Sequence, residues 1–314
     1  MIFCYDMLNN RIERIIQDKI YSEELWMGKK STHEQSLGRI LDPYLEKRSH
    51  QEKDPVLDFL FEYYPFRISH LKRWTPGIGV LLEYSDVEQL PEHSELITDG
   101  KIAQLDPLLF PKKRISAVRW ILQLLEKSQH RKPMFGCFGM HEWAMVYRTT
   151  DIRHDQIPLR LSDDEIAEFV ESRPLLCTHF DAFRFFTEKA QPMNKNRLSR
   201  ENFEEMEQPG CVHTNMDLYK WTTKIYPWVS GELLHDAFLN AAEARKIDMQ
   251  ASPYDATEFG LDPIRIETEE GRKVYLELQM EIYQNSIPIR ERLIHECRKI
   301  LKMVKKSPSR SLTP

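Results

Sequence analysis

Apolar side chains recur at helical spacing along much of this sequence, and several of the runs begin at a capping residue. Between residues 113 and 127 they fall on one face of a helix. Ser162 opens a second helix with a capping box, and this helix should end before Pro174. Ser230 should cap a third, which reaches about residue 247. The pattern predicts a mostly helical protein.

The remaining pattern adds a long C-terminal helix and a small amount of strand. The pattern predicts a helix from Glu269 to about Lys302. Pro288 lies inside this range and should kink or restart the helix. Short apolar runs predict three strands of one small sheet behind the site, at residues 78–84, 175–186 and 263–267. We therefore expect an α+β fold, mostly helical, with a small β-sheet backing a helical site.

Domain organisation follows from where the apolar pattern is strong and where it stops. Residues 1–50 are polar, with two weak apolar stripes that predict peripheral helices. Residues 136–255 contain the candidate chemistry and should form the site-bearing core. The tail at residues 305–314 has little to bury and should be disordered. We expect a single compact domain over residues 1–304.

Composition limits the classes of function. A formal net charge of −5 over 314 residues disfavours a general basic DNA-binding face, although a local basic groove stays open. Five widely spaced cysteines without a CxxC pair indicate neither a disulfide framework nor a thiolate zinc site. The N-terminus lacks the apolar core of a signal peptide, and no run is long enough for a membrane span. These features predict a reduced, cytoplasmic protein without a membrane partner, and they leave its oligomeric state open.

Two segments carry candidate metal ligands. In LLCTHFDAFRFF (175–186), a strand would point His179 and Asp181 in the same direction. In CVHTNMDLYKW (211–221), a helix would place His213 and Asp217 at i and i+4 on one face. Imidazole and carboxylate groups together suit iron, manganese or zinc. The alternative in each segment is a local His–Asp pair that only stabilises the fold.

Other residues in the same region are candidates for catalysis or substrate binding. His141 and Glu142 stand in the apolar frame GMHEWAMVY, where burial would raise the pKa of a carboxyl and fit it for acid–base work. Otherwise His141 is a core histidine and Glu142 faces solvent. Asp255, in the turn IDMQASPYD, is a further catalytic candidate. We expect the substrate to contact Arg184, Lys220, Tyr254 and Trp143.

Across these segments the sequence resembles a bacterial family labelled 3-methyladenine DNA glycosylase. The resemblance is carried by DFLFEYYPFRISHLKRWTPGIGVLLE, GCFGMHEWAMVYR, THFDAFRFF, EQPGCVHTNMDLYKW, IDMQASPYD and IRIET. It implies excision of a damaged base that is flipped into an aromatic pocket, with an acid that activates water or stabilises the sugar cation and with no metal.

Three functions are therefore under consideration. The first is a metal-dependent enzyme, a hydrolase or an oxygenase, that acts on a small-molecule or nucleobase-like substrate. The second is the DNA glycosylase that the resemblance implies. The third is a binding protein that uses the same cavity without turnover.

Overall fold

The computed structural model describes residues 19–152 and 156–306, and it confirms the mostly helical α+β class. The helices are α2 (Glu23–Ser49), α3 (Leu57–Tyr63), α4 (Ile68–Lys72), α5 (Ile115–Gln129), α6 (Met140–Val146), α7 (Asp163–Glu171), α8 (Phe180–Phe183), α9 (Phe203–Met206), α10 (Val212–Lys224), α11 (Gly231–Gln250) and α12 (Glu269–Lys306). Short 3₁₀ turns lie at Val87–Gln89, Pro107–Leu109, Lys112–Arg114, Gln191–Met193 and Thr257–Phe259.

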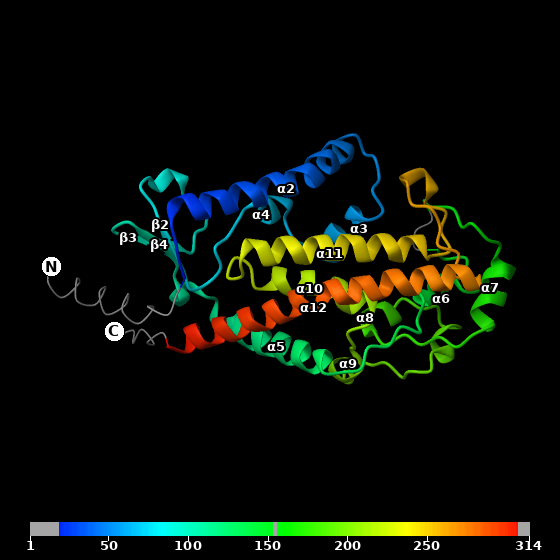
Figure 1. Cartoon of the computed structure of the whole chain (residues 1–314). Coiled ribbons are helices and arrows are strands. Elements are labelled where there is room, and N and C mark those ends of the chain that lie inside the picture. Colours follow the sequence, from blue (N-terminus) through cyan, green and yellow to red (C-terminus); the bar gives the residue numbers. More distant parts are fainter. Residues whose placement is uncertain (1–18, 153–155, 307–314) are drawn as a thin grey trace.

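The centre of the molecule is the helix α10. Its buried residues run almost without a break from Val212 to Trp221 and so cover every face, which is typical of a helix enclosed by others. α11 and α12 pack against it, and α5 packs against α12 (Figure 1). Because α10 has no solvent-facing stripe, its polar residues His213 and Asp217 are held inside the protein.

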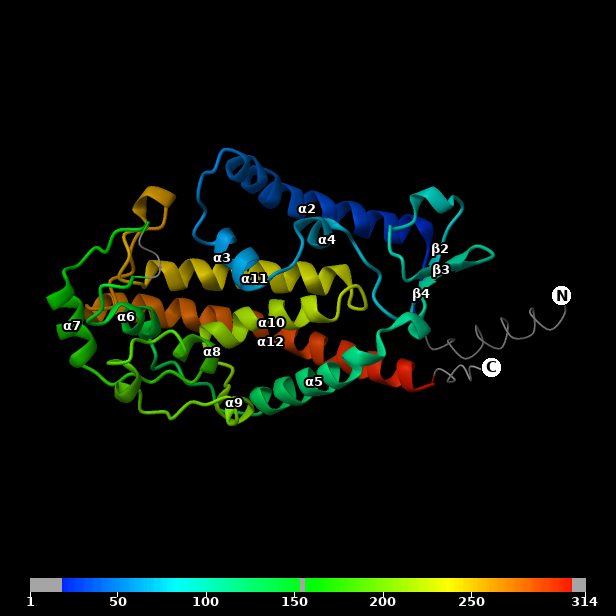
Figure 2. The same ribbon diagram turned by 180° about the vertical axis from the view of Figure 1, so that it is seen from behind.

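The sheet lies far from these polar residues. Its strands are β1 (Lys19–Tyr21), β2 (Val80–Glu83), β3 (Leu96–Asp99) and β4 (Ile102–Leu105), in the order β1-β2-β4-β3. β1 is parallel to β2, while β4 is antiparallel to both β2 and β3. Both views place the sheet at the end of the bundle opposite α6, α7 and α8 (Figures 1 and 2). The sheet therefore does not back the site.

Two of the three predicted strands were wrong. The run 78–84 contains β2, but 175–186 contains the short helix α8 and only an isolated bridge from Leu175 to Asn194. The run 263–267 contains no strand and leads through a turn into α12. Apolar runs this short suit a buried turn as well as a strand, and tertiary packing decides between them.

The predicted helix ends were more accurate. Ser162 forms its capping box with Glu165, and the hydroxyl of Ser230 accepts from the backbone N–H of Leu233 at the start of α11. Pro288 was expected to kink or restart the last helix, but α12 continues through it. Packing of α12 against α5, α10 and α11 compensates for the hydrogen bond that the proline cannot make. One of the two stripes predicted within residues 1–50, at residues 8–16, lies outside the described residues. The disordered tail was predicted from residue 305, but α12 continues to Lys306, and the remainder of that tail lies outside the described residues.

Candidate metal centre

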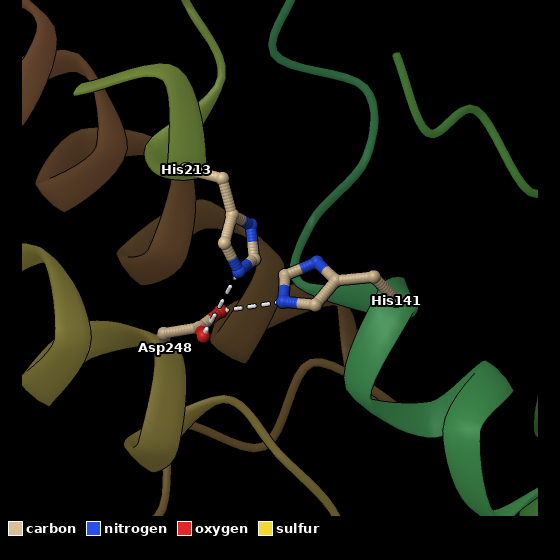
Figure 3. A group of neighbouring side chains, drawn as sticks. All are labelled: His141, His213 and Asp248. Atoms are coloured by element: carbon tan, nitrogen blue, oxygen red, sulfur yellow. Dashed lines mark ion pairs between the residues drawn. The ribbon is translucent and has the colours of Figure 1, made fainter. Parts of the chain in front are cut away.

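Three helices each contribute one buried side chain to a cluster of His141, His213 and Asp248 (Figure 3). His141 lies in the first turn of α6, His213 in the first turn of α10, and Asp248 in the last turn of α11. One potential ligand atom from each residue lies within 4.8 Å of the others. The cluster thus joins parts of the chain that are more than a hundred residues apart.

A glycine and a tryptophan fix α6 against the end of α11. Gly139 precedes α6 with φ of 72°, and a Cβ atom there would lie 3.2 Å from the Cβ of Ala251. Glycine alone combines this left-handed backbone with such a close approach at little cost. Trp143 Nε1 donates to the carbonyl of Ala251 at 2.9 Å. These contacts bring His141 to Asp248.

The distances in the cluster lie on either side of those expected for two ligands of one ion. His141 Nε2 lies 2.7 Å from Asp248 Oδ1, and His213 Nε2 lies 3.8 Å from Asp248 Oδ2. Two ligands that bind one ion at about 2.1 Å stand roughly 3.0–3.4 Å apart. Although His141 Nε2 and Asp248 Oδ1 are close, they are not aligned as a hydrogen bond, and neither has another partner within the described part of the chain. In the metal-free protein the two atoms form an ion pair, and a metal that binds between them would have to displace the proton of His141.

The charges of these groups depend on one another. Burial lowers the pKa of His141, but the Asp248 carboxylate more than offsets this and raises it well above its usual value. Burial and then the neighbouring His141 hold the pKa of His213 well below its usual range. Burial raises the pKa of Asp248, but His141 outweighs this and leaves the carboxyl ionised. In the metal-free protein, Asp248 therefore pairs with a protonated His141 beside a neutral His213.

Arg245 links this cluster to Glu142. The same Nη1 atom of Arg245 donates to Asp248 Oδ2 at 2.8 Å and to Glu142 Oε1 at 2.7 Å. All three side chains are buried, and the guanidinium lies over the ring of Phe59, 4.0 Å from its centroid. Glu142 Oε2 and Arg245 Nε have no hydrogen-bond partner among the described residues. Glu142 thus lies within the core of the site rather than in solvent.

A second group of possible ligands adjoins the first. His179, Asp181 and Asp217 also offer ligand atoms within 4.8 Å of one another, and the ring of His179 stacks on that of His213 at 5.2 Å. His179 Nδ1 lies 2.6 Å from Glu207 Oε1. The other carboxylate oxygen of Glu207 accepts a hydrogen bond from the hydroxyl of Thr214. Because Glu207 accepts from Nδ1, the proton of the neutral ring is on Nδ1. Nε2 is then the nitrogen that could bind a metal.

In this second group a cation is already present. Lys220 Nζ lies 2.9 Å from Asp181 Oδ2 and 3.1 Å from Asp217 Oδ2, while Tyr64 donates to the other Asp217 oxygen at 2.8 Å. Burial lowers the pKa of Lys220, but the two carboxylates outweigh it and keep the ammonium protonated. Lys220 pairs with both carboxylates of the second group, whereas in the first group Arg245 contacts only one oxygen of Asp248 and the other oxygen faces His141. We therefore take the first group as the candidate for a metal ion.

A cavity of about 230 Å³ opens onto the first group. Its buried part includes Glu142, His213 and Arg245, and its walls include Phe59, Tyr63 and Phe185. The cavity is smaller than those that hold drug-sized ligands, which are typically about 300–1,000 Å³. A small molecule in this space would lie against His213 and Glu142.

The structure assigns the predicted site residues to different places. His213 and Asp217 do share α10 at i and i+4, but they belong to different groups, and Lys220 neutralises Asp217. His179 and Asp181 share a group, although a turn and not a strand brings them together. His141, expected as a catalytic group, belongs to the first group of possible ligands.

Four further candidates do not line the described cavity. Trp143 and Tyr254 are buried core residues, and the side chain of Arg184 is 50% exposed beside Asp181. The Asp255 carboxylate accepts from Thr257 in the turn after α11. We therefore find no geometric support for a catalytic role of Asp255 or for substrate contacts by Trp143, Tyr254 and Arg184.

The sequence interpretation missed Asp248 as a possible ligand, Arg245 as the charge paired with it, and Glu207 as the partner of His179. Arg245 and Asp248 are i and i+3 on the buried stripe of α11, and a charged pair on such a stripe is a usable signal. Glu207 gives no comparable signal, because it lies between α9 and α10 without periodic neighbours.

No protein-family model, curated protein or solved structure matches this chain. Over residues 19–152 and 156–306, no helix is both long enough and apolar enough to cross a membrane. The function must therefore be argued from the site itself.

Proposed function

We propose that this protein is a metal-dependent enzyme in which His141, His213 and Asp248 hold a divalent transition metal. The observation that carries the proposal is the pair of close, buried and unaligned atoms, His141 Nε2 and Asp248 Oδ1, beside the neutral ring of His213. Two imidazoles and one carboxylate with an open position are the ligand set of hydrolytic zinc sites and of non-haem iron oxygenases. Iron, manganese and zinc all fit this set.

Glu142 is the group we assign to acid–base work. It lines the cavity, it is buried, and one of its oxygens has no partner among the residues described. Arg245 holds the other oxygen and so fixes the direction of the carboxylate. A carboxylate held in this way beside a metal ion can take a proton from a bound water or return it to a substrate. The metal would supply charge stabilisation or an activated oxygen ligand.

The substrate that fits is small and flat, which includes nucleobase-like rings. Aromatic walls at Phe59, Tyr63 and Phe185 suit a flat molecule, and the volume excludes a large one. Hydrolysis and oxygenation both remain within the proposal, because the ligand set serves either reaction.

The test is metal-dependent thermal stabilisation. Zinc, manganese or ferrous iron added to chelator-treated protein should raise its melting temperature, because an ion that binds only the folded state stabilises it. The shift should disappear in His141→Ala and His213→Ala and persist in His235→Ala, which removes a histidine from a His–Asp pair outside the centre. Equal shifts in all variants would contradict the proposal.

A second candidate function is base excision, which the sequence resemblance implies. The aromatic cavity with a buried Glu142 supports it, because a flipped base needs stacking walls and an acid. The net charge of −5 counts against a DNA-binding face. Release of 3-methyladenine from alkylated duplex DNA that survives chelation would favour this candidate over the metal enzyme.

A further inference from the structure

The second group of possible ligands, His179, Asp181 and Asp217, holds its histidine as metal sites do. The His179 side chain is 1% exposed, and its Nδ1 atom lies 2.6 Å from Glu207 Oε1. The other Glu207 oxygen accepts from Thr214. A carboxylate on one nitrogen of an imidazole fixes the ring and leaves the opposite nitrogen for a metal ion. Here the opposite nitrogen, His179 Nε2, belongs to the ligand group.

The spacing in this group leaves room for a cation between its members. His179 Nε2 lies 4.0 Å from Asp217 Oδ2. The two atoms are too far apart for a hydrogen bond, whereas two ligands that bind one ion at about 2.1 Å can stand up to about 4.2 Å apart. Tyr64 donates to the other Asp217 oxygen at 2.8 Å and so fixes the carboxylate.

A cation already contacts both carboxylates of the group. Lys220 Nζ lies 2.9 Å from Asp181 Oδ2 and 3.1 Å from Asp217 Oδ2. The side chains of Lys220 and Asp181 are 18% and 22% exposed, so this part of the group is open to solvent. A dissolved ion could therefore reach the carboxylates if the ammonium were absent.

This cation position adjoins the proposed metal centre and the cavity. The ring of His179 stacks on that of His213 at 5.2 Å, with 15° between their planes. Ala182, which follows Asp181 in the chain, lines the cavity, and so does Tyr63. Burial and then the charges of Asp181 and Asp217 raise the pKa of Tyr63 to about 12, which agrees with their proximity. The two groups of possible ligands thus form neighbouring positions for positive charge.

We propose that His179, Asp181 and Asp217 form a second metal-type site in which the Lys220 ammonium takes the place of a divalent ion. The lysine supplies the positive charge of a second ion without depending on the supply of metal. Carboxylates favour manganese among the transition metals, so Mn²⁺ is the probe for this site. The inference goes beyond the proposed function, because it concerns separate ligands and needs no ion in the first group.

The test is the number of Mn²⁺ ions that chelator-treated protein binds in equilibrium dialysis. Lys220→Met should bind one more ion per chain than the wild-type protein, because it leaves two carboxylates without their cation. Lys220→Gln should gain the same ion. Its amide keeps a hydrogen-bond donor for the carboxylates, so the test does not depend on the stability of Lys220→Met alone. Lys224→Met is the matched control, since Lys224 is an exposed lysine one turn further along α10. It should bind no more than the wild-type protein.

A second substitution assigns the additional ion to this group. Asp181→Asn replaces a ligand carboxylate by a neutral amide, so the double variant Lys220→Met with Asp181→Asn should lose the additional ion. The inference is overturned if neither Lys220 variant binds more Mn²⁺ than the wild-type protein, or if the additional ion survives Asp181→Asn.

The difference of one ion separates this inference from the proposed function. No ion in the wild-type protein and one in Lys220→Met would refute the proposed metal centre and support the second site. One ion in each would support the proposed centre and refute this inference alone.

Discussion

Arg245 should be among the most important charged residues for stability, because its guanidinium pairs with two buried carboxylates. Its Nη1 atom lies 2.7 Å from Glu142 and 2.8 Å from Asp248, and its side chain is 1% exposed. Arg245→Met keeps much of the apolar contact over Phe59 and removes the charge. Glu142 would then be buried without a cation, while Asp248 would retain only His141.

The expected loss is large. Removing one partner of a buried ion pair costs about 3–5 kcal/mol of unfolding free energy, because the other charge stays buried without compensation. In a chain of this size each kcal/mol shifts the melting temperature by about 2 °C, so Arg245→Met should melt roughly 6–10 °C lower. The control is Arg298→Met, whose pair with Glu126 is 63% and 36% exposed. It should lose no more than about 1 kcal/mol.

Urea unfolding in the presence of a chelator measures both variants without a contribution from metal. The double variant Arg245→Met with Glu142→Gln should recover part of the loss, because it removes the carboxylate that Arg245→Met leaves without a cation. A metal ion should also recover part of it, since the ion supplies positive charge beside Asp248. The reasoning is refuted if Arg245→Met loses no more stability than Arg298→Met.

Three further predictions concern the site. Glu142→Gln should retain the fold and the metal, while any turnover found falls by roughly 10²-fold or more, and normal turnover would exclude Glu142 as the acid or base. Metal affinity should rise as the pH increases from about 6.5, because burial lowers the pKa of His141 but Asp248 raises it by more, and below this raised pKa a metal must displace the proton of His141. A competition titration showing constant affinity would contradict this. Asp255→Asn should leave metal content and turnover unchanged, since among the described residues the hydrogen bonds to its carboxylate come from Thr257; a loss of either would return Asp255 to the site.

The helices were predictable because their signals are local. The apolar face of α5, the Ser162 capping box and the Ser230 cap all lie within a few residues of the ends that they define. The sheet was not predictable in the same way, because β1 pairs with β2 from some sixty residues away and β3 and β4 carry no strong apolar alternation. Long-range pairing of this kind depends on tertiary contacts.

The candidate site also combines local features, which the sequence predicts, with long-range contacts, which it does not. Its histidines stood out because an ionisable group in an apolar frame is unusual anywhere in a chain. Which of them share a ligand set did not follow from spacing, since His213 and Asp217 are four residues apart and yet belong to different groups. Asp248 joins His141 only because α6 and the end of α11 meet at Gly139 and Ala251.

The most direct test of the account is the metal content of protein purified without a metal-affinity tag. Elemental analysis should find close to one iron, manganese or zinc ion per chain in the wild-type protein and in His235→Ala. Little should remain in His141→Ala, in His213→Ala or in Asp248→Asn. A wild-type protein that holds no such ion, takes none up, and melts at the same temperature with and without chelator would contradict the account.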